Sequence, residues 1–301
     1  MHAHAPPLKS YLLLTGSMAL VGSYVALSKP LTAVIPVFAL AFLRFAIAAV
    51  AMVPWSVRPR TEAPLTRTEH RWLFVMSFFG NFLFSVCMLY GVSMTTATAS
   101  GVILATLPAV VALLSWLVLR ERLGGRVLLA VALAVGGIVL LQLARTGTVG
   151  SRSATWLGNL LMFGAVICEA IYVILAKRLS ASRAPLRVSA WVNLWGLALI
   201  TPFGIWQLAR FDLRSLAAPM WGLLLFYSLA ASLFAVWMWV AGLKHVPANR
   251  AGVFTVALPL AATAIGVFVL GESFTLIHAM ALTLATAGVL LIATERARSA
   301  A

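Results

Sequence analysis

The sequence predicts an all-α integral membrane protein, with ten transmembrane helices arranged as two inverted five-helix repeats. Three observations predict this fold. Of the 301 residues, 62% are hydrophobic and 10% are charged, whereas a soluble domain carries about 25% charged residues. Apolar stretches of about 20 residues, long enough to cross a hydrocarbon core of ~30 Å as a helix, recur along the whole chain. The third observation is an internal repeat.

Short loops that hold most of the prolines and arginines separate the apolar stretches. The first stretch follows Lys9 as a signal peptide would, but nine more follow it and it is long enough to cross, so we interpret it as an uncleaved first helix. The sequence contains no long hydrophilic segment, so we expect no appended soluble domain. The ten predicted spans are residues 11–28, 34–53, 72–92, 96–119, 124–143, 155–176, 188–208, 219–242, 248–270 and 275–293.

The distribution of basic residues predicts the orientation of the chain. With a cytoplasmic amino terminus, sixteen Lys and Arg residues fall on the cytoplasmic side and five on the opposite side. This bias predicts a cell inner membrane protein with both termini in the cytoplasm. Orientation and contact with anionic lipid account for the net charge of +15 without a nucleic-acid partner. The five residues on the opposite side are Lys29, Arg145, Arg152, Arg210 and Arg214.

The internal repeat aligns residues 91–123 with residues 242–274 at an offset of 151. A weaker match aligns the first span with the sixth. Because each half holds five spans, an odd number, the second half would enter the membrane in the opposite orientation, which is an inverted-topology repeat. The matched pairs include Gly91/Gly242, Ala97/Ala248, Pro108/Pro259 and Glu121/Glu272 in the strong match, and Gly16/Gly164, Tyr24/Tyr172 and Lys29/Lys177 in the weak one.

The chain resembles the EamA branch of the drug/metabolite transporter superfamily. The resemblance rests on a first span with Gly and aromatic residues, on FLRFAIAA in the second span, and on TTATASGVILATLPAVVALLSWLVLRERL with its echo in the second half. It implies a ten-helix exporter of amino acids and other small metabolites, with repeats at residues 8–145 and 153–296 and a substrate cavity between them. Where the family often has Trp-Gly or Trp-Ala, this chain has Val21-Gly22 and Glu169-Ala170.

Polar residues near the middle of several spans predict a central binding site, because polar groups that face lipid are costly. Each has an alternative role. Arg44 could be structural, Asn81 could hold two helices together, and the Trp pair, four residues apart on one helix face, could be packing. The predicted substrate-binding residues are Arg44, Asn81, Glu169, Tyr172, Trp191, Trp195, Tyr227 and Ser228.

Glu169 stands alone as an acidic residue well inside a predicted span, within GAVICEAIYVILAKR. A buried carboxylate without a partner could take up and release protons near neutral pH. The stretch also resembles the first helix of small multidrug resistance transporters, and this resemblance implies a carboxylate that binds a proton or a cationic substrate. The alternative is a structural ion pair with Arg44.

Pro108 and Pro259 occupy equivalent places in the two repeats, near the middle of their spans. Each removes a backbone hydrogen bond, which deprives the carbonyls of Leu104 and Thr255 of their usual helical partners and predicts a bend. Matched bends would serve as hinges for gates on opposite sides of the site, although proline is also tolerated in passive helices.

Together these features favour a carrier that exports small metabolites by alternating access, with amino acids, including apolar or aromatic ones, as the substrate class that the resemblance implies. A proton-coupled efflux transporter for hydrophobic or quaternary cations is the alternative, and a channel is a further one. The histidines and cysteines show no spacing typical of metal ligands, so we expect no metal site or cofactor. The sequence also shows no arrangement of a nucleophile and a base, so we do not expect an enzyme. The expected partners are a small-molecule substrate and the lipid bilayer, for a monomer or a homodimer.

Overall fold

The structure is a computed structural model that describes residues 8–57, 64–119, 125–143, 149–179, 184–243 and 252–299. Apart from short loops, these residues are helical, as their apolar composition predicts. The first half contains α1 (Leu8–Val34), α2 (Val37–Ala51), α3 (Val53–Ser56), α4 (Arg67–Ser77), η1 (Phe78–Leu83), α5 (Phe84–Met94), α6 (Ala97–Leu104), α7 (Leu107–Leu119) and α8 (Gly125–Leu143). The second half contains α9 (Val149–Leu179), α10 (Pro185–Leu208), η2 (Leu213–Ser215), α11 (Ala218–Leu229), η3 (Ala230–Phe234), α12 (Ala235–Leu243), η4 (Gly252–Val256), α14 (Ala257–Phe268) and α15 (Leu276–Ser299).

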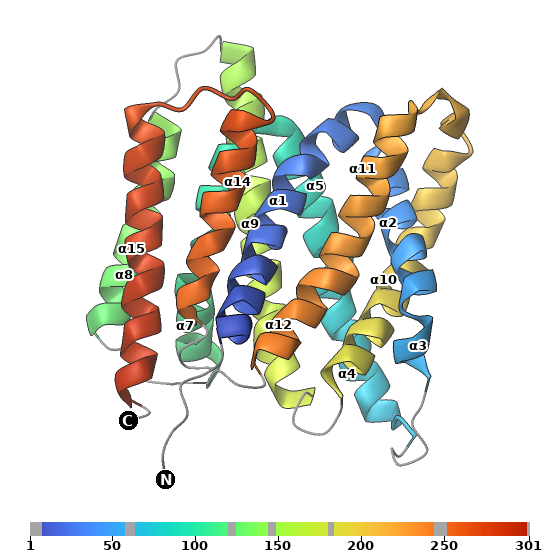
Figure 1. The fold of residues 1–301 in the computed structure, drawn as a ribbon, viewed down its shortest axis with the longest axis horizontal. Helices are drawn as coiled ribbons and strands as arrows, with labels where there is room; N and C mark the ends of the chain where they lie inside the picture. Colours follow the sequence, from blue (N-terminus) through green and yellow to red (C-terminus); the bar gives the residue numbers. More distant parts are fainter. Residues whose placement is uncertain are drawn as a thin grey trace.

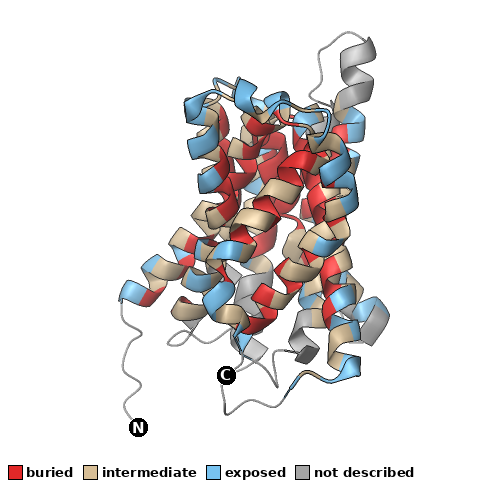
Figure 2. Ribbon diagram, turned by 90° about the vertical axis from the view of Figure 1, so that its right-hand side faces the viewer, coloured by how far each residue is buried: buried red, intermediate tan, exposed pale blue. Residues whose placement is uncertain are grey.

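The helices form a multi-pass membrane bundle. In the described part of the chain, six helical segments are long and apolar enough to cross a membrane, and four shorter apolar helices accompany them. Buried residues face the interior of the bundle, while exposed residues lie on its outside and at its ends (Figure 2). Large apolar side chains are among those exposed on the outside, for example Leu128 and Val135 of α8, as a surface that faces lipid requires.

Successive crossings run in alternating directions (Figure 1). α1 begins and α15 ends at the same end of the bundle, which we call the terminal end, and the other end is the distal end. α1 runs from the terminal to the distal end, whereas α9, the first helix of the second half, runs the opposite way.

Most close helix pairs join the two halves of the chain. α8 packs on α15, α2 on α10 and α6 on α14, while α1 packs on α12 and α14, and α9 on α5 and α7. The pair at one edge, α8 and α15, stands side by side in Figure 1. The interior of the bundle is therefore built mainly at the boundary between the halves.

Two crossings are interrupted by π-helical turns, which the hydropathy pattern did not predict. η1 separates α4 from α5, and η3 separates α11 from α12. Shifted by the 151-residue offset of the repeat, η1 falls on residues 229 to 234, which contain η3. π-helical turns are rare and are found mostly at functional sites. Their matched positions therefore make the helices that contain them candidates for the functional site.

The two prolines lie at changes of helical geometry rather than inside continuous helices. α6 ends at Leu104, and Pro108 is the second residue of α7, where a missing amide costs little. Pro259 is the third residue of α14, which follows the 3-10 turn η4. The helical geometry therefore changes shortly before each proline, while the bends that the sequence predicts stay predictions.

Candidate functional site

Arg44 is buried in the middle of α2, with 5% of its surface exposed. One terminal nitrogen, Nη2, donates a hydrogen bond to Ser85 Oγ of α5 at 3.0 Å, and the guanidinium carbon lies 4.1 Å from the centroid of the Phe45 ring. Nε has no hydrogen-bond partner. A buried guanidinium with an unused donor is costly unless a further acceptor binds to it, so Arg44 is suited to receive an anionic group.

Two tyrosines from opposite halves lie beside Arg44. The Tyr24 ring of α1 and the Tyr227 ring of α11 meet edge to face, with centroids 5.9 Å apart. The Arg44 guanidinium lies 5.9 Å from the Tyr227 ring centroid, and the arginine also interacts electrostatically with Tyr24. The Tyr227 hydroxyl is fully buried and has no hydrogen-bond partner. These residues bring α1, α2 and α11 together around one buried cation.

Glu169 of α9 is half-buried and interacts electrostatically with Tyr24 and with Tyr172, one turn further along α9. Tyr172 packs against the backbone of η1, because a β-carbon at Gly80 would overlap its ring. The hypothesis of an ion pair between Glu169 and Arg44 is wrong: both residues lie in the described part of the chain, and no ion pair within 4.0 Å joins them, whereas one joins Lys29 to Glu272. Tyr24 interacts electrostatically with both charges.

We call Tyr24, Arg44, Glu169, Tyr172 and Tyr227 the central cluster. It contains one cation and one carboxylate, and neither neutralises the other. Within the described residues, Glu169 has no hydrogen-bond partner that would explain a purely structural carboxylate. Chemically, the central cluster can bind a molecule that supplies an anionic group to Arg44 and a cationic group or a proton to Glu169.

Asn81 and Ser228 are engaged in helix contacts. Asn81 lies in η1, and its side-chain amide donates to the carbonyl of Val192 in α10 at 3.0 Å. Ser228 is fully buried beside Tyr227, but its hydroxyl donates to Leu224 within the same helix at 2.7 Å. The structure thus favours the interhelical role for Asn81 and a locally satisfied hydroxyl for Ser228.

Trp191 and Trp195 share a face of α10, as their spacing predicts, and this face packs on α4. The Trp191 ring lies 5.4 Å from His70 and the Trp195 ring 5.4 Å from Phe74. Both belong to an apolar cluster around Leu73 and Val192, which Tyr172 also contacts. Neither indole N–H has a hydrogen-bond partner within the described residues. The two tryptophans therefore adjoin the central cluster through Tyr172.

Sequence reasoning missed three residues around the central cluster. Tyr24 was matched to Tyr172 in the repeat, and that pairing was a signal that both could serve the site. Ser85 binds Arg44, and Asn193 of α10 is buried and donates to the carbonyl of Phe45 at 3.1 Å. The sequence carries no comparable signal for Ser85 and Asn193, because single Ser and Asn residues in apolar helices are ordinary helix contacts.

Two comparisons of the sequence give the same result. The model of the EamA-like transporter family matches residues 8–143 and 156–294. The uncharacterized transporter YetK of Bacillus subtilis is 34% identical over 281 residues, which cover 93% of this chain and 85% of YetK. An uncharacterized transporter of Archaeoglobus fulgidus is 26% identical, and the match covers 94% of this chain and 96% of that protein.

The fold also occurs in a solved structure. One crystal structure superposes with a TM-score of 0.64 over 97% of this chain and 99% of the other chain, at 18% sequence identity. At this identity the likeness concerns the fold alone, and it covers both halves of the bundle.

Proposed function

The chain belongs to the EamA-like transporter family of membrane transporters, and from that premise we propose that it is a carrier that exports amino acids, including apolar and aromatic ones, by alternating access. The central cluster is the observation that carries the substrate class. A free amino acid presents a carboxylate and an ammonium group, and Arg44 and Glu169 offer the complementary charges without neutralising each other. The rings of Tyr24, Tyr172 and Tyr227 supply contact area for an apolar or aromatic side chain.

Alternating access is supported by the way the halves meet. Ten crossings, as two inverted five-helix repeats, are compatible with the six long and four shorter apolar helices and with the opposite directions of α1 and α9. In an inverted repeat the substrate site lies between the halves, and one half rocks against the other. The central cluster has this location, since α1, α2 and α9, α11 belong to different halves.

Counterflow in proteoliposomes tests the proposal. The purified full-length protein is reconstituted with unlabelled amino acid inside, and uptake of the same labelled amino acid is followed. A carrier exchanges labelled for unlabelled substrate and accumulates label transiently, whereas a channel dissipates the gradient. Absence of counterflow for all standard amino acids, in vesicles that contain folded protein, would exclude an amino-acid carrier.

The proposed orientation places both termini in the cytoplasm of a cell with an inner membrane. Cysteines introduced at exposed Val57, which directly follows α3 at the terminal end, and at exposed Ser273, in the connection between α14 and α15 at the distal end, would report it. An impermeant thiol reagent added to whole cells should label Ser273→Cys and should label Val57→Cys only after the membrane is opened. The reverse pattern would place the termini outside.

A second candidate function is proton-coupled efflux of hydrophobic or quaternary cations. Tyr172 favours it, because it links Glu169 to the aromatic side chains of Trp191 and Trp195, and aromatic faces next to a carboxylate bind organic cations. Competition separates the candidates: a quaternary amine should inhibit counterflow of an amino acid only weakly under the first proposal, but should itself be transported under the second.

A further inference from the structure

A second charged cluster lies at the distal end of the bundle, away from the central cluster. Lys29, near the end of α1, binds Glu272, in the connection between α14 and α15, with Nζ 2.7 Å from Oε1. The Glu272 carboxylate also accepts hydrogen bonds from the backbone N–H groups of Ala97 at 2.7 Å and Thr98 at 3.0 Å, and from the Thr98 hydroxyl at 3.0 Å. We call these four residues the distal cluster.

The distal cluster satisfies the carboxylate completely. The amides of Ala97 and Thr98 are the first of α6, where a helix leaves N–H groups unpaired and favours a negative charge. Burial alone would raise the pKa of Glu272, but the hydrogen bonds from Lys29, Thr98 and Ala97 outweigh it and lower that pKa. Glu272 is therefore charged at neutral pH and caps a helix of the other half of the chain.

The backbone after α14 directs Glu272 to this position. Gly271 adopts φ +67°, a conformation that favours glycine, and the Glu272 N–H returns to the carbonyl of Gly266 at 2.9 Å. Gly266 leaves room for the contact, because a β-carbon there would lie 2.8 Å from Glu272 Oε2 and 2.9 Å from the Thr98 hydroxyl. The backbone conformation at Gly271 and the space left by Gly266 thus both position Glu272 for its contact with the first half of the chain.

The helices joined by the distal cluster are also packed tightly below it. A β-carbon at Gly22 of α1 would overlap the carbonyl of Leu258 in α14, and one at Gly101 of α6 would lie 2.6 Å from Cβ of Ala262. α1 and α6 belong to the first half, and α14 belongs to the second. Any motion that separates the halves at the distal end must break the bonds of Glu272.

We propose that Lys29, Glu272 and the amino terminus of α6 form a latch that holds the halves together at the distal end and must open whenever the transporter opens there. The latch acts between states of the protein, whatever the substrate is. A contact of this kind stabilises one conformation in proportion to the bonds that the other conformation lacks.

EPR distance measurements test the latch on the full-length protein in nanodiscs. Spin labels are attached at Ala33→Cys, at the end of α1, and at Ser273→Cys, both exposed, after Cys87 and Cys168 are replaced by serine. Lys29→Ala and Glu272→Gln should each shift the balance toward the longer distance by about tenfold, the effect of losing one charge-assisted hydrogen bond. Distributions identical to that of the parent protein would overturn the proposal, even if thermal stability fell, because the contact would then be a passive staple.

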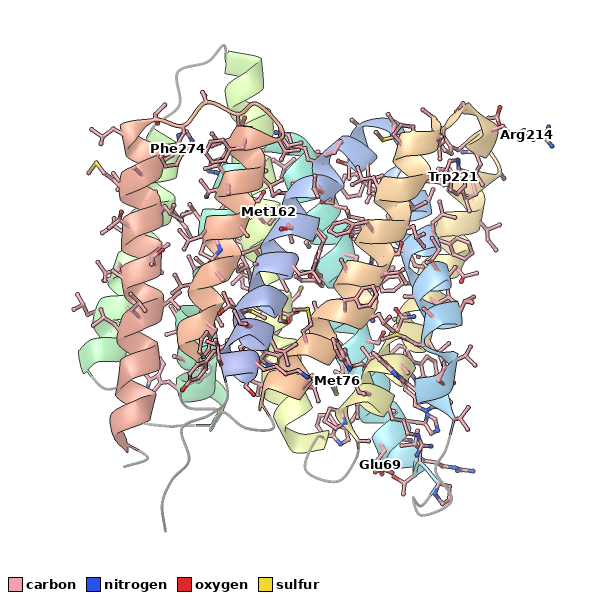
Figure 3. All side chains as sticks on the ribbon, viewed as in Figure 1. Glu69, Met76, Met162, Arg214, Trp221 and Phe274 are labelled. Atoms are coloured by element: carbon pink, nitrogen blue, oxygen red, sulfur yellow. The ribbon has the colours of Figure 1, made fainter. Side chains whose placement is uncertain are left out.

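Two further variants separate the latch from a simple change of charge. Gly266→Ala keeps every charge but displaces the carboxylate, so it should also favour the longer distance. Reversing the ion pair, Lys29→Glu with Glu272→Lys, should not restore the short distance between the spin labels. An ammonium group at residue 272 cannot accept hydrogen bonds from the backbone N–H groups of α6. Restoration by the reversed pair would contradict the helix-capping part of the latch. Arg214→Ala removes an exposed cation from the same end (Figure 3) and should leave the distribution unchanged.

The measurement needs no substrate, so its result stands apart from the choice of amino acids as substrates. If counterflow fails while the distances shift as expected, the latch holds and the substrate proposal fails. If counterflow succeeds while the distances do not shift, the substrate proposal holds and the latch is refuted.

Discussion

The distal cluster and the central cluster use the same kinds of side chain in opposite ways. Glu272 receives four bonds, from a lysine, two amides and a hydroxyl, while Glu169 has neither an ion pair nor a hydrogen bond with any described residue. Both carboxylates lie at contacts between the halves of the chain. A carboxylate whose bonding capacity is filled within the protein stabilises one conformation, whereas one left unfilled in the interior is available to a ligand or a proton.

Glu169→Gln tests directly whether the carboxylate of the central cluster serves a ligand or a proton, and it should have the largest effect on transport. Transport should fall by about 100-fold or more and lose its pH dependence, because the amide can neither hold a proton nor pair with an ammonium group. The melting temperature should stay within about 2 °C of wild type, since no ion pair is lost. Transport assays and thermal melts on one preparation check both parts.

The control for that variant is Asp212→Asn, which makes the same chemical change at an exposed carboxylate of the distal end. It should leave transport unchanged. A Glu169→Gln protein that transports with wild-type rate and pH dependence would remove Glu169 from the site.

Arg44→Lys should have the next largest effect. Lysine keeps the charge but loses the planar fork that bonds Ser85 and stacks on Phe45. We expect KM for the transported amino acid to rise about tenfold, which corresponds to ~1.4 kcal/mol of binding energy. Initial rates of counterflow over a range of substrate concentrations provide the measurement. Ser85→Ala, which removes a single bond, should raise KM less; an equal or larger rise would mean that Arg44 acts only through Ser85.

Glu272→Gln, besides shifting the conformational balance at the distal end, should lower the stability of the protein. Loss of the charged cap and ion pair should lower the free energy of unfolding by about 1 to 2 kcal/mol at pH 7. Because the bonds lower the pKa of Glu272 in the folded protein, this contribution is present above the pKa of a free glutamate, about 4.3, and is lost as pH falls through the folded value. Melting curves of both proteins should therefore differ by a constant amount from pH 8 to about pH 5 and converge at lower pH. A difference that disappears near pH 6 would contradict the charged cap.

Ser228→Ala should have the smallest effect of these substitutions. Ser228 lies beside the central cluster, but its hydroxyl bond stays within its own helix. The change should alter stability by less than about 0.5 kcal/mol and leave KM unchanged. A clear rise in KM would show that the hydroxyl turns toward the substrate.

Hydropathy alone predicted the helical bundle, because each crossing must be apolar over about 20 residues to lie in lipid. The ends of the helices differ by several residues from the predicted spans; α9, for example, extends from Val149 to Leu179 rather than from 155 to 176. Hydropathy does not mark the exact end of a helix that projects beyond the hydrocarbon core. The sequence predicted a bend at Pro108, since proline cannot donate the missing bond, and the structure ends α6 at Leu104 and begins α7 at Leu107.

The candidate site was predicted less well than the fold. Mid-span position singled out Arg44, Glu169 and Tyr227, each of which interacts with Tyr24 or with another of the three, but the rotation of each helix about its axis decides which side chains meet. That rotation is set by packing between distant segments, which explains why the ion pair was wrong and why Asn81 bonds α10 instead. The latch was absent from the prediction because Glu272 lies outside any span and its partners come from residues 29, 97 and 98.

The paired π turns, η1 and η3, carry a consequence for the ancestry of the chain. Such turns are rare, so separate origins at two repeat-related positions would need two independent insertions at the same place. If the two segments that match the family model arose by duplication of one ancestral unit, a single insertion in that unit accounts for both turns. Asn81 and Ser232, which occupy matching places at the 151-residue offset, would then descend from one polar position. On this reasoning the irregular turns are older than the divergence of the two halves.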